Sequence, residues 1–498
     1  MVFSSHAFLF YFLPLAIGFY YVVPRRGRHL VLTLGSYLFY GWANPLFVVL
    51  LLASTVVDYV CGLALVGVGP VWLARLVRAP RTAELWASPL VPLSPDAPRS
   101  PRQRLALWCS VVTNLSLLGF FKYFNFAAEN VAAVASWLGV PGLELDRIVR
   151  VTLPLGISFY TFQSMSYTID IYRGRVTPLR NLIDFACYVS MFPQLVAGPI
   201  IRFSEVADQL VRRSHTVAKF SRGIAFVSLG LAKKVLLANP CGSLADVAFG
   251  AGSITPWDAW YGVTAYAFQI YFDFSGYSDM AIGLGLMLGF VFPKNFDSPY
   301  VSASITEFWR RWHISLSTWL RDYLYIPLGG NRRGELRTYA NLGVVMLLGG
   351  LWHGAAWTFV AWGGIHGLLL ALERWQGKDA WYRRLPRPAR VAVTFFIVLI
   401  TWVFFRSPDF PSAARYLGHM FGAIEPEPAA ALVTGILYQP YYLTTFAVAA
   451  AVTWMGPQSW DWTRSMSEIK VAGIFALLVV AAGVLATQAY NPFIYFIF

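Results

Sequence analysis

Long apolar runs, separated by short polar or basic stretches, dominate the hydrophobic pattern of this chain. A helix needs about 20 mostly apolar residues to cross a bilayer. The first runs occupy residues 7–23, 30–42 and 46–66, and Pro24 and the Ala43-Asn44-Pro45 turn separate them. The pattern therefore predicts three successive spans. Further spans are predicted at residues 105–121, 148–172, 224–238, 257–292, 339–372, 391–405, 441–455 and 471–498.

Two regions leave the number of crossings open. Residues 257–292 are long enough for two passes, or for one span followed by a surface segment. Residues 124–140 are amphipathic, and we expect them at the outer face or partly buried. A surface helix at residues 82–88 is a further expectation, within a Pro- and Arg-rich loop at residues 74–104.

Prolines and glycines interrupt two of the apolar segments. Pro154 and Gly156 fall inside the run at 148–172, which predicts a break or kink in that span. Residues 182–201 contain Phe192-Pro193-Gln194-Leu195-Val196-Ala197-Gly198-Pro199 and have basic residues on both sides. This pattern favours a re-entrant segment, whose irregular backbone is tolerated only against protein or a water-filled cavity. Such a segment is either the wall of a reaction chamber or a hairpin lying on the surface.

Composition fits a membrane protein with several spans. The 498 residues are 57% hydrophobic and 13% charged, whereas about 25% of residues are charged in soluble chains; the mean hydropathy is +0.54. The net charge of +14 is concentrated in loops such as 25–29 and 74–104, so it indicates anionic lipid rather than nucleic acid. Because such loops stay in the cytoplasm, both clusters predict an N-terminus outside.

The sequence gives no sign of a metal site, a disulfide framework or a cleaved leader. The four cysteines have no metal-binding spacing. The first apolar run has its basic residues after it rather than before it, which is the wrong order for a cleaved signal peptide. We expect a retained first helix, no metal and no bound cofactor.

One ionisable side chain, His353, lies in an apolar run rich in small residues, Gly349-Gly350-Leu351-Trp352-His353-Gly354. An ionisable residue inside a membrane is costly and points to function, and the glycines allow a backbone or ligand to approach the imidazole. The alternative is a structural histidine in a helix-packing patch. His366 follows thirteen residues later, a rotation of about 220° on an unbroken helix, so we expect it on another face, as a packing residue or one that supports the site from behind.

Two further segments carry candidate binding residues. Polar side chains in the aromatic stretch 269–279, among them Asp273, Ser275 and Tyr277, should face a cavity rather than lipid. Residues 305–337 are dense in tryptophan and arginine, which is typical of an amphipathic surface helix at a membrane interface. A sharper hypothesis is a site for an anionic ligand, because arginine binds phosphate through two parallel hydrogen bonds.

Taken together, and in the order in which they occur along the chain, the motifs resemble the membrane-bound O-acyltransferase superfamily, in particular its bacterial alginate O-acetyltransferase-like branch. The resemblance rests on Phe308-Trp309-Arg310-Arg311-Trp312-His313-Ile314-Ser315-Leu316-Ser317 together with the segment around His353, and it covers about residues 1–375. It implies an all-α fold, a ring of about 11 transmembrane helices with re-entrant segments around a central tunnel. We expect one membrane-embedded domain over 1–498, with closing helices at 391–498.

The resemblance also implies an activity, the transfer of an acetyl group from acetyl-coenzyme A across the bacterial inner membrane. A buried neutral imidazole can take a hydroxyl proton; this is the role expected for His353, with His313 orienting donor or acceptor. The partners implied are a cytoplasmic acyl thioester, membrane lipids, an extracytoplasmic acetyltransferase and a polysaccharide acceptor. Substrate-binding roles are expected for Arg310, Arg311, Arg321, Asp273, Ser275, Tyr277, Trp352 and Gln194.

Several alternatives stay open at this point. The acyl group can be D-alanyl or longer, and an acyl-His353 intermediate can form. A transporter or flippase would also carry polar residues in its spans, although no internal repeat of the transporter kind is visible. A membrane scaffold without catalysis is the remaining class.

Overall fold

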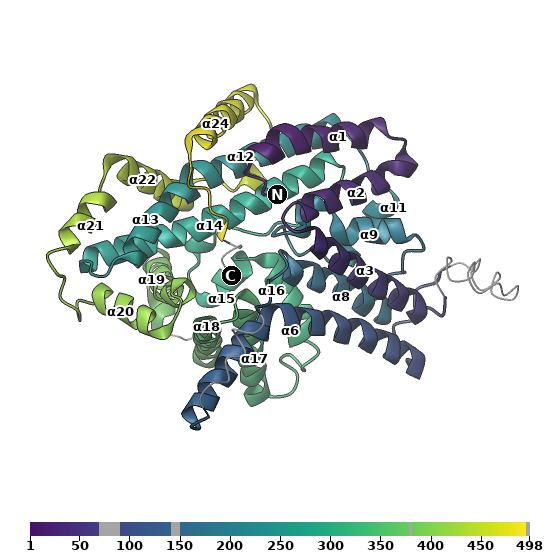
Figure 1. Ribbon diagram of the computed structural model, residues 1–498, viewed down its shortest axis with the longest axis horizontal. Coiled ribbons are helices and arrows are strands. Elements are labelled where there is room, and N and C mark those ends of the chain that lie inside the picture. Colours follow the sequence, from purple (N-terminus) through teal and green to yellow (C-terminus); the bar gives the residue numbers. More distant parts are fainter. Residues whose placement is uncertain (69–89, 141–149, 378–380, 495–498) are drawn as a thin grey trace, which may run out of the picture. The chain divides into compact units, whose positions relative to one another are not determined.

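The computed structural model describes residues 1–68, 90–140, 150–377 and 381–494, and every regular element in these residues is a helix (Figure 1). Five helical segments are long and apolar enough to cross a membrane. This confirms the all-α class, whereas the ring of about 11 helices stays a prediction. The five segments are α3 (Pro45–Leu65), α6 (Pro101–Trp137), the run α12–η3–α13 (Val217–Gly250), α19 (Arg387–Arg406) and α24 (Glu468–Thr487).

The chain forms two compact units. The first comprises Met1–Phe220 with Gly285–Phe292, and the second comprises Ser221–Leu284 with Pro293–Phe498. The single domain expected over 1–498 stays a prediction.

The first unit opens with the three helices that the hydrophobic pattern predicts. They are η1 (Ala7–Phe12) running into α1 (Leu13–Val22), then α2 (Arg28–Gly41), then α3. Pro24 follows the first helix, and the side chain of Asn44 accepts a hydrogen bond from the Leu46 N–H at 3.0 Å to cap α3. The local signals of proline and a capping asparagine therefore fix these boundaries.

One continuous helix, α6, replaces the two segments expected at 105–121 and 124–140. Its 37 residues correspond to a length of about 55 Å, which exceeds the hydrocarbon core of a bilayer at about 30 Å. The helix continues through residues 121–124 because they contain no proline or glycine that could end it, so the boundary predicted there was wrong. Polar contacts hold α6 against α3, where the Asp58 carboxylate accepts hydrogen bonds from Ser110 at 2.6 Å and Asn114 at 2.8 Å.

The interrupted segments of this unit are short helices and loops. α8 (Ile157–Tyr172) begins directly after Gly156. Of the break or kink predicted at Pro154 and Gly156, the structure shows a break, because both residues precede the helix. Gly156 has a φ of +73°, and a Cβ there would lie 2.5 Å from the Leu195 carbonyl oxygen. Residues 182–201 form α9 (Leu182–Ser190) and α10 (Phe192–Leu195) with a buried irregular end, so they are not a plain spanning helix. α11 (Phe203–Val211) follows.

The loop expected at 74–104 falls partly outside the described residues, and so does the surface helix expected at 82–88. Residues 90–100, which are described, contain no helix, and Ser100 and Gln103 then form the capping box that starts α6.

In the second unit, close glycine contacts join two long helical segments. These are the run α12 (Val217–Ala232), η3 (Lys233–Ala238) and α13 (Asn239–Gly250), and the single helix α14 (Pro256–Met287). A Cβ at Gly230 would lie 2.4 Å from the Gly276 carbonyl oxygen, so the two backbones touch. The number of helices within residues 257–292 was left open by the sequence. α14 is one continuous helix over most of this range.

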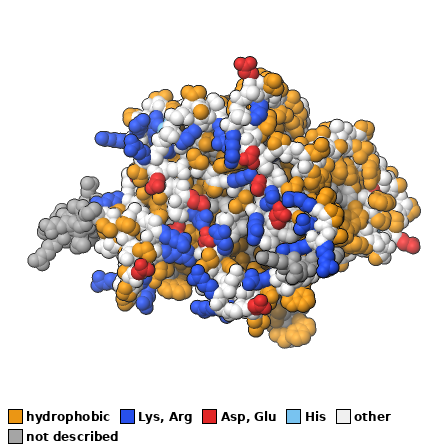
Figure 2. Space-filling model, turned by 180° about the vertical axis from the view of Figure 1, so that it is seen from behind, with side chains coloured by type: hydrophobic (Ala, Val, Ile, Leu, Met, Phe, Trp, Pro, Cys, Tyr) orange, Lys and Arg blue, Asp and Glu red, His pale blue; other side chains and the backbone are white. Residues whose placement is uncertain are grey.

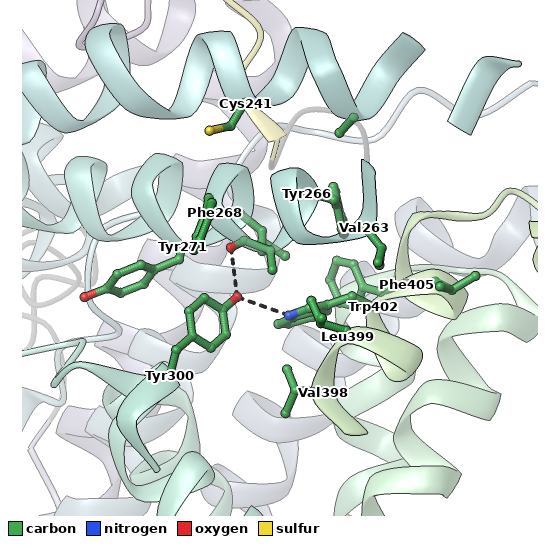
Figure 3. Packing of buried hydrophobic residues seen from close by; sticks show 14 of the residues in the cluster. Cys241, Val263, Tyr266, Phe268, Tyr271, Tyr300, Val398, Leu399, Trp402 and Phe405 are labelled. Carbon is green, nitrogen blue, oxygen red and sulfur yellow. Dashed lines mark hydrogen bonds between the residues drawn. The ribbon is translucent and has the colours of Figure 1, made fainter. Parts of the chain in front are cut away.

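A buried aromatic core joins helices of the second unit. The Tyr300 hydroxyl donates to the Ala267 carbonyl at 2.8 Å and accepts from the Trp402 indole at 3.1 Å, which ties α14 to α19 (Figure 3). Both polar groups are thereby satisfied inside an apolar cluster. The remaining helices of this unit are η4 (Pro299–Val301), α15 (Ile305–Arg311), α16 (Ile314–Leu320), η5 (Arg321–Tyr325), α17 (Glu335–His353), α18 (Trp357–Gln376), η7 (Trp381–Arg384), α20 (Phe410–Met420), α21 (Ala430–Leu437), α22 (Pro440–Met455) and α23 (Ser459–Trp462).

Hydrophobic side chains are abundant on the protein surface. Figure 2 shows them over much of one face, with Lys and Arg side chains gathered among acidic ones elsewhere on it. Exposed large apolar residues include Leu46, Leu105, Leu432 and Val480, which belong to α3, α6, α21 and α24. A surface of this kind fits a lipid environment, since soluble proteins seldom expose contiguous apolar patches of large area.

Candidate functional site

His353 is the last residue of α17, at a tight corner before α18. The run predicted as one span at 339–372 is two helices that lie side by side (Figure 1), joined by residues 354–356. The rotation argument that separated His353 from His366 assumed an unbroken helix, so its premise was wrong. A Cβ at Gly354 would lie 2.1 Å from the Phe359 ring, which explains why glycine occupies the corner.

The corner places the His353 imidazole in an aromatic setting. The side chain is 5% exposed, and its ring centroid lies 5.2 Å from that of Trp362 and 5.3 Å from that of Phe405. Trp352, the preceding residue, stacks edge-on at 5.0 Å. These neighbours restrict the ring and exclude water from most of its surface.

His313 occupies the αL region of the backbone, with φ +43° and ψ +56°. Residues other than glycine rarely adopt this conformation, and it persists only where the surroundings enforce it. Asn295 does so, because its carbonyl accepts from the Ile314 N–H at 2.9 Å and its side chain accepts from the Ser315 N–H at 3.2 Å. The corner between α15 and α16 is thus pinned at His313.

The two histidines that the sequence singles out lie close together. Their ring centroids are 6.3 Å apart, and His313 is fully buried between Phe274 at 4.6 Å and Trp352 at 5.8 Å. The structure therefore brings together His353, His313 and Trp352. Among the described residues, no group of three His, Cys, Asp or Glu side chains is placed to hold a metal ion.

His353 lies on the wall of a cavity of about 330 Å³, which we call the histidine cavity. Its lining is mostly apolar, and the polar exceptions include Arg321 and Arg374. The other lining residues are Thr306, Trp309, Leu316, Ser317, Leu320, Tyr325, Asn331, Leu342, Val345, Met346, Gly349, Trp362 and Leu370. A cavity with one imidazole and mostly apolar walls can hold a small uncharged group beside a base.

A second, polar hollow of about 730 Å³ adjoins the histidine cavity, since Thr306 and Arg374 line both. We call it the arginine recess; its remaining lining is Asp297, Ser304, Glu307, Arg310, Arg311, Glu373, Gly377 and Arg383. The Glu373 carboxylate, on α18, accepts from the Ile305 N–H at 2.6 Å and the Thr306 N–H at 2.9 Å. This caps the start of α15 and fixes the boundary between the two hollows.

The three arginines predicted to bind phosphate have different surroundings. Arg311 is paired with Glu307 at 3.0 Å, and Arg321 is paired with Asp322 at 2.7 Å while lining the histidine cavity. Arg310 is exposed in the arginine recess, and within the described part of the chain no carboxylate forms an ion pair with it. Arg310 is therefore the most available of the three.

Five other predicted binding residues do not line either hollow, and Trp352, which contacts both histidine rings, is one of them. Asp273 pairs with Lys234 at 2.8 Å and accepts from the Ile494 N–H at 2.8 Å, which is a structural arrangement. Ser275 is buried, and Tyr277 packs on Phe493 with ring centroids 4.7 Å apart. Gln194 belongs to the first unit, where its amide donates to the Tyr188 carbonyl. Their roles in binding substrate stay predictions.

Sequence reasoning missed Arg374, Arg383 and Trp309. Arg374 and Arg383 follow the span predicted at 339–372, and the sequence gives no signal that α18 folds back beside α15. Trp309 stood in the recognised motif, but its role was not assigned. Its indole donates to His366 Nδ1 at 3.3 Å, and the other nitrogen of His366 lies 3.1 Å from the Thr401 hydroxyl.

Comparison with known proteins identifies the family. The family model described as membrane-bound O-acyltransferase matches residues 175–406. The chain is 44% identical to the probable alginate O-acetylase AlgI of Pseudomonas putida, over the full length of both. It is 48% identical to the Pseudomonas aeruginosa protein of that name over 84% of this chain and 75% of the relative. The peptidoglycan O-acetyltransferase of Helicobacter pylori is 35% identical over 85% of this chain and 80% of the relative. The chain therefore belongs to the membrane-bound O-acyltransferase family and is an O-acyltransferase.

Proposed function

We propose that the protein transfers acetyl groups from acetyl-coenzyme A in the cytoplasm, across the bacterial inner membrane, for O-acetylation of an extracytoplasmic polysaccharide. The observation that carries the proposal is the placement of the His353 imidazole in an apolar cavity that adjoins the arginine recess. A coenzyme A thioester has this same polarity, with charged phosphates at one end and a small uncharged acyl group at the other.

The arginine recess supports phosphate binding at the donor end. Arg310, Arg374 and Arg383 are exposed there, and no carboxylate in the described ranges forms an ion pair with them. Guanidinium groups bind phosphate oxygens in bidentate fashion. The pantetheine arm would then pass Thr306 and Arg374, which line both hollows, and carry the thioester to His353.

In the proposed reaction, His353 is the general base. One ring nitrogen takes the proton of the acceptor hydroxyl as its oxygen attacks the thioester carbonyl carbon. The C–O bond forms, the C–S bond breaks, and the imidazolium returns the proton to the leaving thiolate. His313, with its ring centroid 6.3 Å away, is proposed to orient the acyl group.

The acceptor is proposed from the relatives. The names of the Pseudomonas and Helicobacter proteins specify alginate and peptidoglycan, both polysaccharides, and acetyl transfer rather than D-alanyl transfer. We also propose an extracytoplasmic acetyltransferase as the partner that completes transfer outside the membrane, since the resemblance of the motifs implies such a partner.

The His353→Ala variant tests the catalytic assignment. Loss of the base should reduce acetyl transfer by at least about 100-fold, the lower end of what general-base catalysis contributes. The measurement is transfer of radiolabelled acetyl from acetyl-coenzyme A by purified protein in vesicles, together with thermal unfolding to show that the variant folds. His419→Ala is the matched control, since His419 is buried but lines neither hollow. Full activity of folded His353→Ala removes the assignment.

The Arg374→Gln variant tests the donor site. Loss of one charge-assisted hydrogen bond to phosphate, worth about 1.5–3 kcal/mol, should raise the KM for acetyl-coenzyme A at least about tenfold and leave kcat nearly unchanged. Arg464→Gln is the control, because Arg464 is exposed and lines neither hollow. An unchanged KM in Arg374→Gln rules out Arg374 as a donor-binding residue.

A further inference from the structure

A lateral groove of about 470 Å³ lies in the second unit, separate from the histidine cavity and the arginine recess. Its walls come from α12 and η3, from α22 and α23, and from α24, and they are largely apolar. The residues that define this lateral groove in the argument below are Lys233, Leu237, Val448, Val452, Ser459 and Leu477.

One charged group stands at the polar end of the lateral groove. Lys233 Nζ donates to Asp279 Oδ2 at 2.7 Å and to Ser459 Oγ at 2.8 Å, and Ser459 donates to the same carboxylate at 2.7 Å. An ammonium group carries three N–H bonds, and two of them have acceptors in the described part of the chain. The third is available to an oxygen that enters the groove.

A π-helical turn brings this lysine into the groove. η3 begins at Lys233, and π turns inside α-helices are frequent at functional sites. The next residue, Lys234, pairs with Asp273 in the interior, where the two side chains are 3% and 1% exposed. Lys233 and Asp279 are 16% and 13% exposed, so this pair is the more accessible of the two.

The dimensions of the groove match one acyl chain. Its wall on α22 runs from Thr444 past Val448 and Val452 to the end of the helix, and continues to Gly456. Twelve residues of helix rise about 18 Å, and one leaflet of hydrocarbon is about 15 Å deep, half of a core of about 30 Å. Trp462 lines the groove together with Ser459, and tryptophan is enriched where acyl chains meet headgroups.

We propose that the lateral groove binds one phospholipid molecule. An acyl chain lies along α22, and a phosphate or ester carbonyl oxygen accepts the third N–H of Lys233. Since the charges of Lys233 and Asp279 balance, the head must offer an acceptor oxygen but need not be anionic. This site goes beyond the proposed acetyl transfer and does not depend on it.

Cross-linking with a phosphatidylethanolamine that carries a diazirine in its acyl chain tests the proposal on the full chain in vesicles. We expect peptide mapping to place the cross-links in residues 444–456, and excess unlabelled phosphatidylethanolamine to remove them. No cross-link there, or cross-links spread evenly over exposed apolar helices, overturns the proposal. Removal by palmitoyl-coenzyme A but not by the phospholipid also overturns it, in favour of an acyl-thioester site.

Substitutions inside and outside the lateral groove test whether the cross-link arises in the groove itself. Val448→Trp should fill the groove and abolish the cross-link, with Val452→Phe as a second variant if the first is unstable. Leu443→Trp is the control, because Leu443 is exposed on the same helix, outside the groove lining and about 140° around the axis from Val448. Equal labelling of a folded groove-filling variant and the control contradicts the proposal.

The role of Lys233 at the polar end of the lateral groove can be tested without leaving its partner Asp279 as an unpaired charge. The double variant Lys233→Met, Asp279→Asn removes both charges, since removal of one partner would destabilise the fold. We expect this folded double variant to retain less phospholipid than the unaltered protein in native mass spectrometry. Retention of the same number of lipids shows that Lys233 does not hold the head.

Discussion

At the residue scale, a backbone conformation that is costly for histidine marks the site. His313 sits in the αL region and is held there by Asn295, which also accepts from the Ser315 hydroxyl at 2.8 Å and donates to Ser278 at 3.0 Å. Strain of this kind costs about 1–3 kcal/mol and persists where surrounding structure enforces it. The contacts of Asn295 hold the His313 imidazole beside that of His353, which supports a shared role for the two rings.

A second residue-scale feature is the hydrogen-bonded chain behind the histidine cavity. The Thr401 hydroxyl donates to the Val398 carbonyl at 2.8 Å, accepts from His366 at 3.1 Å, and His366 accepts in turn from the Trp309 indole. Because the Thr401 hydroxyl proton already goes to the Val398 carbonyl, the ring N–H of His366 must be the donor to Thr401. The other ring nitrogen, Nδ1, is then free of a proton and accepts from Trp309. Trp309 lines the histidine cavity, so His366 positions one of its walls.

We expect Trp309→Phe to destabilise the protein by about 1–3 kcal/mol, because it leaves a buried acceptor on His366 without its donor. The ring that lines the cavity is largely kept. Thermal unfolding in detergent measures the effect, and Trp375→Phe is the control because Trp375 is 72% exposed. A Trp309→Phe protein as stable as this control contradicts the positioning role of His366.

At the scale of elements, glycines set the distance between α17 and α18. A Cβ at Gly350 would lie 2.2 Å from the Phe359 carbonyl oxygen, and a Cβ at Gly363 would lie 2.3 Å from that of Met346. Backbone atoms cannot move aside as a flexible side chain can. The hairpin that carries His353 therefore depends on two small residues, one from each helix.

Gly350→Ala should force the helices apart, lower stability by about 1–3 kcal/mol and reduce transfer, because His353 is three residues further along α17. Gly343→Ala is the matched control on the same helix, since a Cβ there meets nothing within 4 Å. It should be neutral, or stabilising by up to about 1 kcal/mol through helix propensity. Unfolding midpoints and acetyl transfer for both variants decide the matter, and equal behaviour of the two would refute the packing argument.

At the scale of the whole molecule, the distribution of basic residues among the apolar segments predicts the orientation of the chain in the membrane. Basic residues cluster at 25–29 and again in the loop at 74–104. We propose on the positive-inside rule that both face the cytoplasm and that the N-terminus lies outside.

Cysteine labelling tests the orientation. His6→Cys should react with a membrane-impermeant maleimide in intact cells, whereas Ser94→Cys should react only after the inner membrane is opened. The native protein reports the background, since Cys109 is exposed in α6. The reverse pattern of labelling would invert the proposed topology.

Local signals made much of the first unit and the histidine pair predictable. The early helix boundaries follow from Pro24 and Asn44, and the motifs alone point to His313 and His353 without showing that the two rings lie close together. The merger at α6 was missed because periodicity reports helix but not how many crossings a helix makes. The helices α20 and α21 were missed because they are shorter than a span.

By itself, the sequence determined the class of protein, the family and the two histidines, because hydrophobic runs and motif order are properties of neighbours along the chain. Only the tertiary structure decided that α17 and α18 fold back at Gly354, that Arg374 lies between the histidine cavity and the arginine recess, and that Asp273 pairs with Lys234 instead of lining either hollow. The physical reason is that these relations depend on which backbones can touch. Between α17 and α18 that contact is set by glycines facing one another across the helices, and the sequence alone does not tell which glycines meet.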